Sequence, residues 1–190
     1  MRNKFFIETY GCQMNDLDSE KIAGNLSHNG MEAAAHPSQA DVIILNTCSV
    51  REKAVQKVYA RLAEIKKRKT GQANLVVGVV GCMAQLEGKT ILSRAPFVNF
   101  VAGPQKGHAM SDLVAQAASG AAPVIDLRME DDPDSMETTH VLRENPWRAG
   151  VTIQEGCSRL CAFCVVPLTR GKERDRQSEN IVREVEGLVA

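Results

Sequence analysis

The chain has 190 residues, 44% of them hydrophobic and 24% charged, so it can bury a core and is not a disordered tail. Its 23 basic residues balance 23 acidic residues, so a nucleic-acid partner would have to be met by a local basic patch. No apolar run approaches the roughly 20 residues of a membrane span, and Glu8 ends the first apolar stretch too early for a signal peptide. We therefore expect a cytosolic (cytoplasmic) protein with no membrane partner.

Short apolar runs alternate with amphipathic segments over residues 1–127. The pattern predicts strands at 4–10, 41–46, 75–80, 98–101 and 124–127. Helices are predicted between them at 15–29, 50–69, 84–94 and 107–118. The second strand is apolar enough to be buried on both faces, as in a parallel sheet. The alternation of strands and helices predicts a parallel α/β sheet with crossover connections.

Residues 128–148 break this rhythm with many acidic residues and two prolines, and their composition predicts a linker or surface loop. A strand at 149–154, a long loop at 155–176 and a helix at 180–189 are predicted to follow. One strand–loop–helix unit cannot bury its own apolar face. We therefore expect the second domain, at 149–190, to be incomplete.

Six cysteines fall into two groups of three, and in a reducing compartment such groups are more often metal ligands or catalytic thiols than disulfides. Cys157, Cys161 and Cys164 form a C-x3-C-x2-C run, whose thiolates can hold three corners of a cubane iron–sulfur cluster and leave one iron open. Zinc would need a fourth ligand, for which His140 is the nearest candidate in the sequence. Cys161 and Cys164 also have the spacing of a redox-active thiol pair.

The other three cysteines are dispersed, at about one strand–helix unit from one another. Cys12, Cys48 and Cys82 each follow the end of a predicted strand. In a parallel sheet these ends share one edge, where open α/β folds bind their ligands, so we expect the three thiols to converge. Gly11 and Gly81 suit turns that need a positive φ or a close backbone approach. The alternative is three unrelated cysteines buried in the core.

The run from Cys157 to Cys164, with Phe163 before its last cysteine, resembles the cluster loop of the radical S-adenosylmethionine (SAM) superfamily. Its flanks resemble the methylthiotransferase family, through Ile153-Gln154-Glu155-Gly156-Cys157, Cys164-Val165-Val166-Pro167 and Thr169-Arg170-Gly171. The residues around the dispersed cysteines resemble the branch that methylthiolates N6-isopentenyladenosine beside the tRNA anticodon. They read Tyr10-Gly11-Cys12-Gln13-Met14-Asn15, Asn46-Thr47-Cys48-Ser49-Val50-Arg51 and Gly81-Cys82-Met83-Ala84-Gln85.

The resemblance implies a Rossmann-like auxiliary-cluster domain at 1–127, a linker at 128–148, and the first βα unit of a radical SAM partial (β/α) barrel at 149–190. It implies one [4Fe-4S] cluster on Cys12, Cys48 and Cys82, and a second, with SAM, on Cys157, Cys161 and Cys164. Phe163 would contact SAM. The reaction implied is addition of a methylthio group to C2 of the adenine, with a tRNA anticodon loop and an electron donor as partners.

Basic residues beside the cluster loop are the candidates for RNA contact: Arg170, Lys172, Arg174 and Arg176. No residue is assigned a catalytic role. The chain departs from the family pattern at Leu168, where an aromatic residue is usual, and at Asp175-Arg176-Gln177, where Ser-Arg-Pro is more usual.

Members of the family continue through further barrel units to an RNA-binding domain. We therefore expect these 190 residues alone to be inactive as an enzyme. Two other classes of function remain open: a non-catalytic iron–sulfur scaffold or electron carrier, and a structural zinc-binding module.

Overall fold

The apolar runs of the first part of the chain form one parallel sheet in the order β2-β1-β3-β4-β5-β6. This arrangement comes from a computed structural model, which describes residues 4–50, 52–120, 122–137 and 140–189. The strands are β1 (Lys4–Tyr10), β2 (Glu32–Ala33), β3 (Val42–Thr47), β4 (Val76–Gly81), β5 (Phe100–Ala102) and β6 (Val124–Asp126). The predicted parallel, Rossmann-like α/β fold is confirmed.

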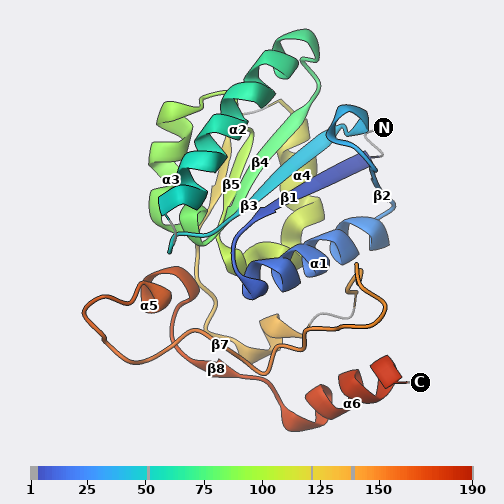
Figure 1. Ribbon diagram of the computed structural model, residues 1–190, viewed down its shortest axis with the longest axis vertical. Helices are drawn as coiled ribbons and strands as arrows, with labels where there is room; N and C mark the ends of the chain where they lie inside the picture. The colour runs from blue at the N-terminus through green and yellow to red at the C-terminus, as the bar shows by residue number, and fades with distance from the viewer. Residues whose placement is uncertain (1–3, 51, 121, 138–139, 190) are drawn as a thin grey trace.

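Helices cover both faces of the sheet (Figure 1). The helices α2 (Glu52–Gly71) and α3 (Cys82–Arg94) pack on one face, and α1 (Gln13–His28) and α4 (Met110–Ala118) pack on the other. Two 3-10 turns, η1 (Pro37–Gln39) and η2 (Pro104–Ala109), lie in the connections. The helix predicted at 107–118 is thus split into η2 and α4.

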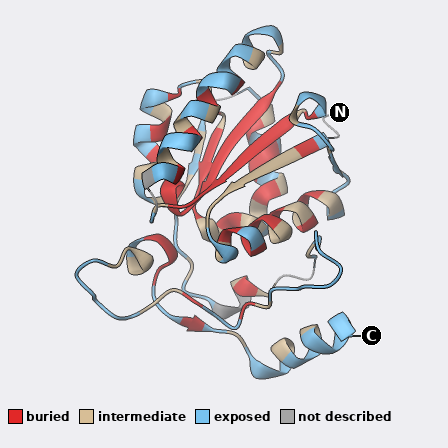
Figure 2. Cartoon of the chain, in the orientation of Figure 1, coloured by how far each residue is buried: buried red, intermediate tan, exposed pale blue. Residues whose placement is uncertain are grey.

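Strand β3 shows why the core has two halves. Ile43 and Leu45 pack with α2 and α3, whereas Val42 and Ile44 pack with α1 and α4, because successive side chains of a strand point to opposite faces. Every residue of β3 and of β4 is buried (Figure 2). The continuous apolar runs in the sequence are the signature of such strands, which are covered on both sides.

The strand order contains a topological switch point. After β1 the chain first adds β2 on one side, and then returns to place β3 on the other side of β1. In doubly wound folds the crevice at the carboxyl ends of such strands is the usual ligand site. β2 is not apparent from the sequence, because both of its residues are exposed and carry no apolar pattern.

Two helices begin closer to the strands than the sequence predicts. The helix α1 starts at Gln13 rather than Asn15, with Cys12 as its N-cap, and α3 starts at Cys82 itself, with Gly81 as its N-cap. Gly81 has φ of +95°, as the prediction of a special turn requires. At Gly11, a Cβ would lie 2.3 Å from Asn15 Oδ1, so a close approach explains that glycine.

Residues 128–148, predicted as a linker or surface loop, run along the surface of the first part of the chain; their role as a linker between domains stays a prediction. This segment contains η3 (Pro133–Met136) and buries the side chain of Met136. The amide of Leu142 donates to the carbonyl of Glu20 in α1 over 3.1 Å. The backbone of His140 fills the space where a Cβ of Gly24 would be. The segment packs along α1, which has a glycine at the point of contact.

The last part of the chain is less regular than predicted. The strand expected at 149–154 is reduced to β7 (Gln154–Glu155), which pairs antiparallel with β8 (Arg174–Asp175). The expected long loop contains α5 (Val166–Arg170) as well as β8, and α6 (Ser178–Val189) ends the segment. Only two residues of β7 find a partner strand, so the rest of the apolar run stays irregular. Among the described residues, no helix is both long and apolar enough to cross a membrane.

Candidate functional site

Cys12, Cys48 and Cys82 line one cavity of about 260 Å³ at the carboxyl edge of the sheet. Cys12 follows β1, Cys48 follows β3 and Cys82 follows β4, so the cavity lies at the switch point. Cys48 and Cys82 are buried and Cys12 is exposed. The predicted convergence of the three thiols on one site is confirmed, whereas their role as ligands stays a prediction.

Two of these cysteines lie at helix N-termini, and the third accepts a hydrogen bond from a backbone amide. Cys12 and Cys82 occupy the N-terminal ends of α1 and α3, where unpaired amides and the helix dipole stabilise anions. The amide of Val50 donates to Cys48 Sγ over 3.4 Å. Burial raises the pKa of the Cys82 thiol, while the neighbouring Arg170 and Thr169 act to lower it. A metal ion or an iron–sulfur group binds the thiolate form.

Buried amides hold the ends of β1 and β3 beside each other. Asn15 Nδ2 donates to Asn46 Oδ1 over 3.0 Å, and Asn46 Nδ2 donates to the Asn15 carbonyl over 2.9 Å. Asn46 Nδ2 also donates to Ser19 Oγ over 2.9 Å. The Cys12 thiol donates to Asn15 Oδ1 over 3.4 Å, so the network reaches the cysteine. Sequence reasoning did not assign these residues a role, although a polar Asn46 at the end of an apolar strand was a signal.

The opposite wall of the cavity comes from the last part of the chain. Its lining residues are Gln154, Glu155, Gly156, Val165, Val166, Thr169 and Arg170. Gly156 directly precedes Cys157, and Val165 directly follows Cys164. The two ends of the second cysteine group are therefore attached to the wall of the cavity that the first group lines.

The loop between these ends is exposed. Phe163 is 91% exposed and Leu160 is 94% exposed, and Cys161 is exposed as well. The Cys157 amide donates to the Gly171 carbonyl over 3.1 Å, which ties the start of the loop to the residue after α5. In the part of the chain that the structure describes, no group of three or more His, Cys, Asp or Glu side chains is arranged to hold a metal ion, and this applies to both cysteine groups. Ligation by Cys12, Cys48 and Cys82, and by Cys157, Cys161 and Cys164, thus stays a prediction.

Two residues that line the cavity have buried polar atoms without a hydrogen-bond partner. Among the described residues, the buried side-chain atoms that lack a hydrogen-bond partner are Ser49 Oγ, Arg170 Nη1 and Arg174 Nε. Ser49 and Arg170 line the cavity of the three thiols. Buried donors of this kind are normally satisfied. Two such donors beside three thiols fit a bound group that accepts hydrogen bonds.

Three of the four residues predicted to contact RNA are instead buried in ion pairs, and this prediction is corrected. Arg170 pairs with Asp18 and Glu155, and Arg174 also pairs with Glu155. The side chain of Arg176 is 5% exposed and pairs with Glu137 and Glu184 over 2.7 Å each. Clusters of arginine in a sequence do not distinguish a basic surface from internal pairs, because the acidic partners are far away in the chain. Lys172 is exposed, and its RNA contact stays a prediction.

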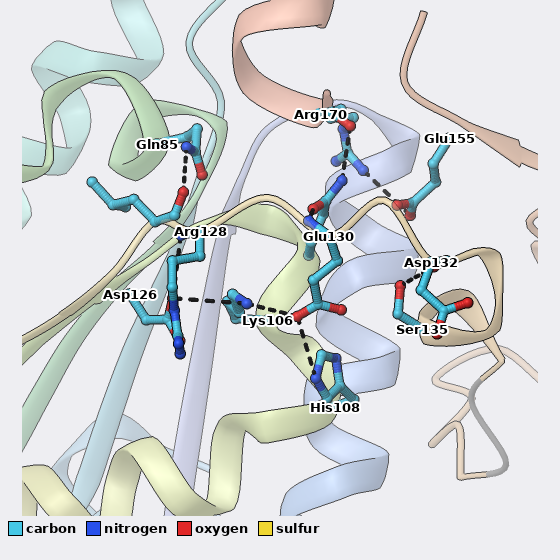
Figure 3. A network of polar contacts seen from close by, with 12 residues as sticks. Gln85, Lys106, His108, Asp126, Arg128, Glu130, Asp132, Ser135, Glu155 and Arg170 are labelled. Atoms are coloured by element: carbon cyan, nitrogen blue, oxygen red, sulfur yellow. Dashed lines mark hydrogen bonds and ion pairs between the residues drawn. The ribbon is translucent and has the colours of Figure 1, made fainter. Parts of the chain in front are cut away.

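A wider polar network holds α5 in place (Figure 3). The buried Lys106 lies 2.6 Å from Glu130 and 3.7 Å from Asp126, which fastens the chain after β6 to η2. Gln105 accepts the Glu130 amide over 2.7 Å and donates to the Arg170 carbonyl over 2.9 Å. The backbone at Arg170 is thereby connected to the sheet edge through one glutamine side chain.

The sequence of this chain matches that of known proteins over nearly its whole length. The model of the uncharacterized protein family UPF0004 matches residues 4–103. A tRNA-2-methylthio-N(6)-dimethylallyladenosine synthase of Hydrogenobaculum sp. is 46% identical over 98% of the chain and 43% of the relative. Proteins of the same name from Solibacter usitatus and Maricaulis maris are 45% and 44% identical, with 41% and 42% of their lengths covered. The chain thus spans less than half the length of these curated relatives.

Proposed function

Because the chain belongs to the uncharacterized protein family UPF0004, and its relatives carry the name of a tRNA-modifying synthase, we propose that it is the cluster-binding region of a tRNA methylthiotransferase. The substrate position is C2 of N6-isopentenyladenosine, the nucleoside also called N6-dimethylallyladenosine, next to the anticodon. The observation that carries this proposal is the shared wall. Residues directly before and after the second cysteine group line the cavity of the first group.

The first group, Cys12, Cys48 and Cys82, is proposed to hold an auxiliary [4Fe-4S] cluster. The N-terminal ends of α1 and α3 lie at Cys12 and Cys82, the Val50 amide donates to Cys48, and Ser49 and Arg170 supply donors to the bound group. With three protein ligands, one iron is left open for a further ligand. Asn15 and Asn46 keep the ends of β1 and β3 at a constant separation, which a rigid cluster requires.

The second group, Cys157, Cys161 and Cys164, is proposed to hold the [4Fe-4S] cluster that binds SAM. When bound, this cluster supplies the electron that cleaves SAM, and the auxiliary cluster supplies the sulfur that reaches the adenine. The exposed Phe163 stands beside the last cysteine and is available to contact SAM. The attachment of both loop ends to the first cavity supports a short path between the two groups.

The proposed partners follow from this chemistry. The anticodon loop of tRNA presents an unstacked base, and the exposed Lys172 beside the second group is the remaining basic candidate for a phosphate contact. An electron donor must reduce the SAM-binding cluster. The cytoplasm, where tRNA is modified, is the proposed location. We expect methylthiolation to require the further length that the relatives possess, with the division into 1–127 and 149–190 corresponding to their auxiliary-cluster and SAM-binding parts.

Anaerobic reconstitution with iron and sulfide tests the proposal. The chain should bind about eight irons and about eight sulfides, and should show the reduced-cluster signal in electron paramagnetic resonance. Changing Cys157, Cys161 and Cys164 together to Ala should leave about four irons, and so should the triple change at Cys12, Cys48 and Cys82. The second variant should also be less stable, because its cluster is linked to folding of the larger domain. A chain that binds zinc alone, or no iron, would exclude the proposal.

The non-catalytic alternative needs a separate test, because it also predicts two clusters. A scaffold or electron carrier would bind iron without binding SAM. Equilibrium dialysis of the reconstituted chain with labelled SAM should show binding that is lost in the Cys157, Cys161 and Cys164 variant. Full cluster loading without SAM binding would favour the scaffold.

A further inference from the structure

The buried side chain of Arg170 has one terminal nitrogen that donates a hydrogen bond and one that does not. The residue is 6% exposed. Its Nη2 donates to Asp18 Oδ2 over 2.5 Å, whereas its Nη1 has no hydrogen-bond partner and lies 3.7 Å from Glu155 Oε1. A buried donor of this kind is rare in a folded protein unless another group satisfies it.

Arg170, which carries this nitrogen, lines the same cavity as Cys12, Cys48 and Cys82. Cys82 and Arg170 line this cavity from opposite parts of the chain. Ser49 Oγ, the second donor without a partner, lines the same cavity. Two unsatisfied donors therefore belong to the wall around the group that the three thiols are proposed to hold.

We propose that Arg170 Nη1 donates a hydrogen bond to a sulfur of the cluster on Cys12, Cys48 and Cys82, and thereby raises its reduction potential. This inference rests on the proposed function and deepens it. A guanidinium in the cavity wall stabilises the more negatively charged, reduced state, and hydrogen bonds to the sulfurs act in the same direction. Since Arg170 follows Cys164 through α5, the segment that carries the second group also tunes the first.

Arg174 provides a matched control on the same segment. It is as buried as Arg170, and its Nη2 lies 3.1 Å from the same carboxylate, that of Glu155. Its Nη1 donates to Ser135 Oγ and to the Asp132 carbonyl, and the residue does not line the cavity of the thiols. The two arginines differ in whether they line the cavity of the proposed cluster.

The experiment uses the chain with Cys157, Cys161 and Cys164 changed to Ala, so that one cluster is measured. Four variants are made in this background: R170Q, R170K, R174Q and the double change D18N/R170Q. The double change avoids leaving Asp18 charged and unpaired. Each protein is reconstituted anaerobically with ferrous iron and sulfide, its iron is counted, and its fold is checked by circular dichroism. The reduced fraction is then measured by electron paramagnetic resonance at one fixed solution potential.

R170Q should lower the ratio of reduced to oxidised cluster by about tenfold, because a nearby positive charge and a hydrogen-bond donor are lost. D18N/R170Q should lower the ratio by a smaller factor, because it also removes the negative charge of Asp18. R170K should recover part of the ratio, and R174Q should leave it within about threefold of the parent, since Arg174 does not line the cavity of the thiols. Loss of iron from folded Arg170 variants, but not from R174Q, would equally support the contact. Equal iron and equal ratios in the Arg170 and Arg174 variants would overturn this inference alone. A parent chain without iron would overturn the proposed function as well.

Discussion

Arg170 and Asp18 stand 152 positions apart in the sequence, yet Arg170 Nη2 lies 2.5 Å from Asp18 Oδ2, and both side chains are more than nine-tenths buried. Asp18 belongs to the first half of α1, and Arg170 ends α5. The pair therefore fastens the segment that carries the second cysteine group to the domain that carries the first. A buried pair of this kind adds little net stability, but it is costly to break, because Arg170 then keeps only Glu155, 3.7 Å away, as a charged partner.

Removal of Asp18 should show this cost. Asp18→Ala is expected to lower the free energy of unfolding by about 3 to 5 kcal/mol. The double change of Asp18→Ala with Arg170→Met should recover much of the loss, since no buried charge is left alone. Urea unfolding followed by circular dichroism measures both. The control is Asp16→Ala in the same turn of α1, where the side chain is exposed. Equal losses for Asp16→Ala and Asp18→Ala would contradict the role of the pair.

Glu137 should make the attachment of the last segment sensitive to acid. Its hydrogen bond with Arg176 holds the pKa of the Glu137 carboxyl below its ordinary value of 4.5. The unfolded chain therefore binds the proton more readily than the folded chain, so the stabilisation is fully present above pH 4.5. It is lost as the pH falls through the lowered pKa.

Comparison of wild type with Glu137→Gln tests this sign. In urea unfolding, the variant should be less stable than wild type at pH 7, and the difference should disappear below the lowered pKa of Glu137. The exposed Glu179→Gln in α6 serves as the control and should give little difference at any pH. A difference between wild type and Glu137→Gln that persists unchanged at low pH would refute an electrostatic origin.

Gly156 should be required for the shape of the second cysteine loop. Its φ is +77°, and a Cβ at this position would lie 2.0 Å from the carbonyl oxygen of Lys172. Gly156→Ala should therefore displace the paired backbone beside Cys157 and reduce iron at the second group, leaving about four irons on the first. Gly30→Ala is the matched control, because Gly30 also has a positive φ, of +85°, but a Cβ there would meet no atom within 4 Å. Equal iron content in both variants would show that the close approach is unimportant.

Phe163 should contribute to SAM binding without contributing to folding. Since the side chain is 91% exposed, Phe163→Ala should change the free energy of unfolding by less than about 0.5 kcal/mol. Leu160→Ala is the control, as Leu160 is an apolar residue of the same loop that is 94% exposed. Equilibrium dialysis of the reconstituted chains with SAM should show weaker binding for Phe163→Ala alone. A marked loss of stability, or unchanged SAM binding, would count against the assignment.

The strands of the sheet and the fold class depend on local sequence patterns and could be predicted from the sequence. The buried runs at Val42–Thr47 and Val76–Gly81 are continuous and apolar, and such runs specify strands that are covered on both faces. Each dispersed cysteine follows such a run or a comparable one, and parallel strands end at a common edge. Fold class and the convergence of Cys12, Cys48 and Cys82 therefore followed from spacing alone.

Only the tertiary structure shows which charged residues pair and how the last segment packs. Arg170, Arg174 and Arg176 form a basic run in the sequence, but the folded chain brings them to Asp18, Glu155, Glu137 and Glu184 and buries them. The position of such partners depends on the path of the whole chain and leaves no local periodicity. The same reason applies to Arg170 at the thiol cavity and to the antiparallel pairing of β7 with β8, since both require contacts between segments that are distant in the sequence.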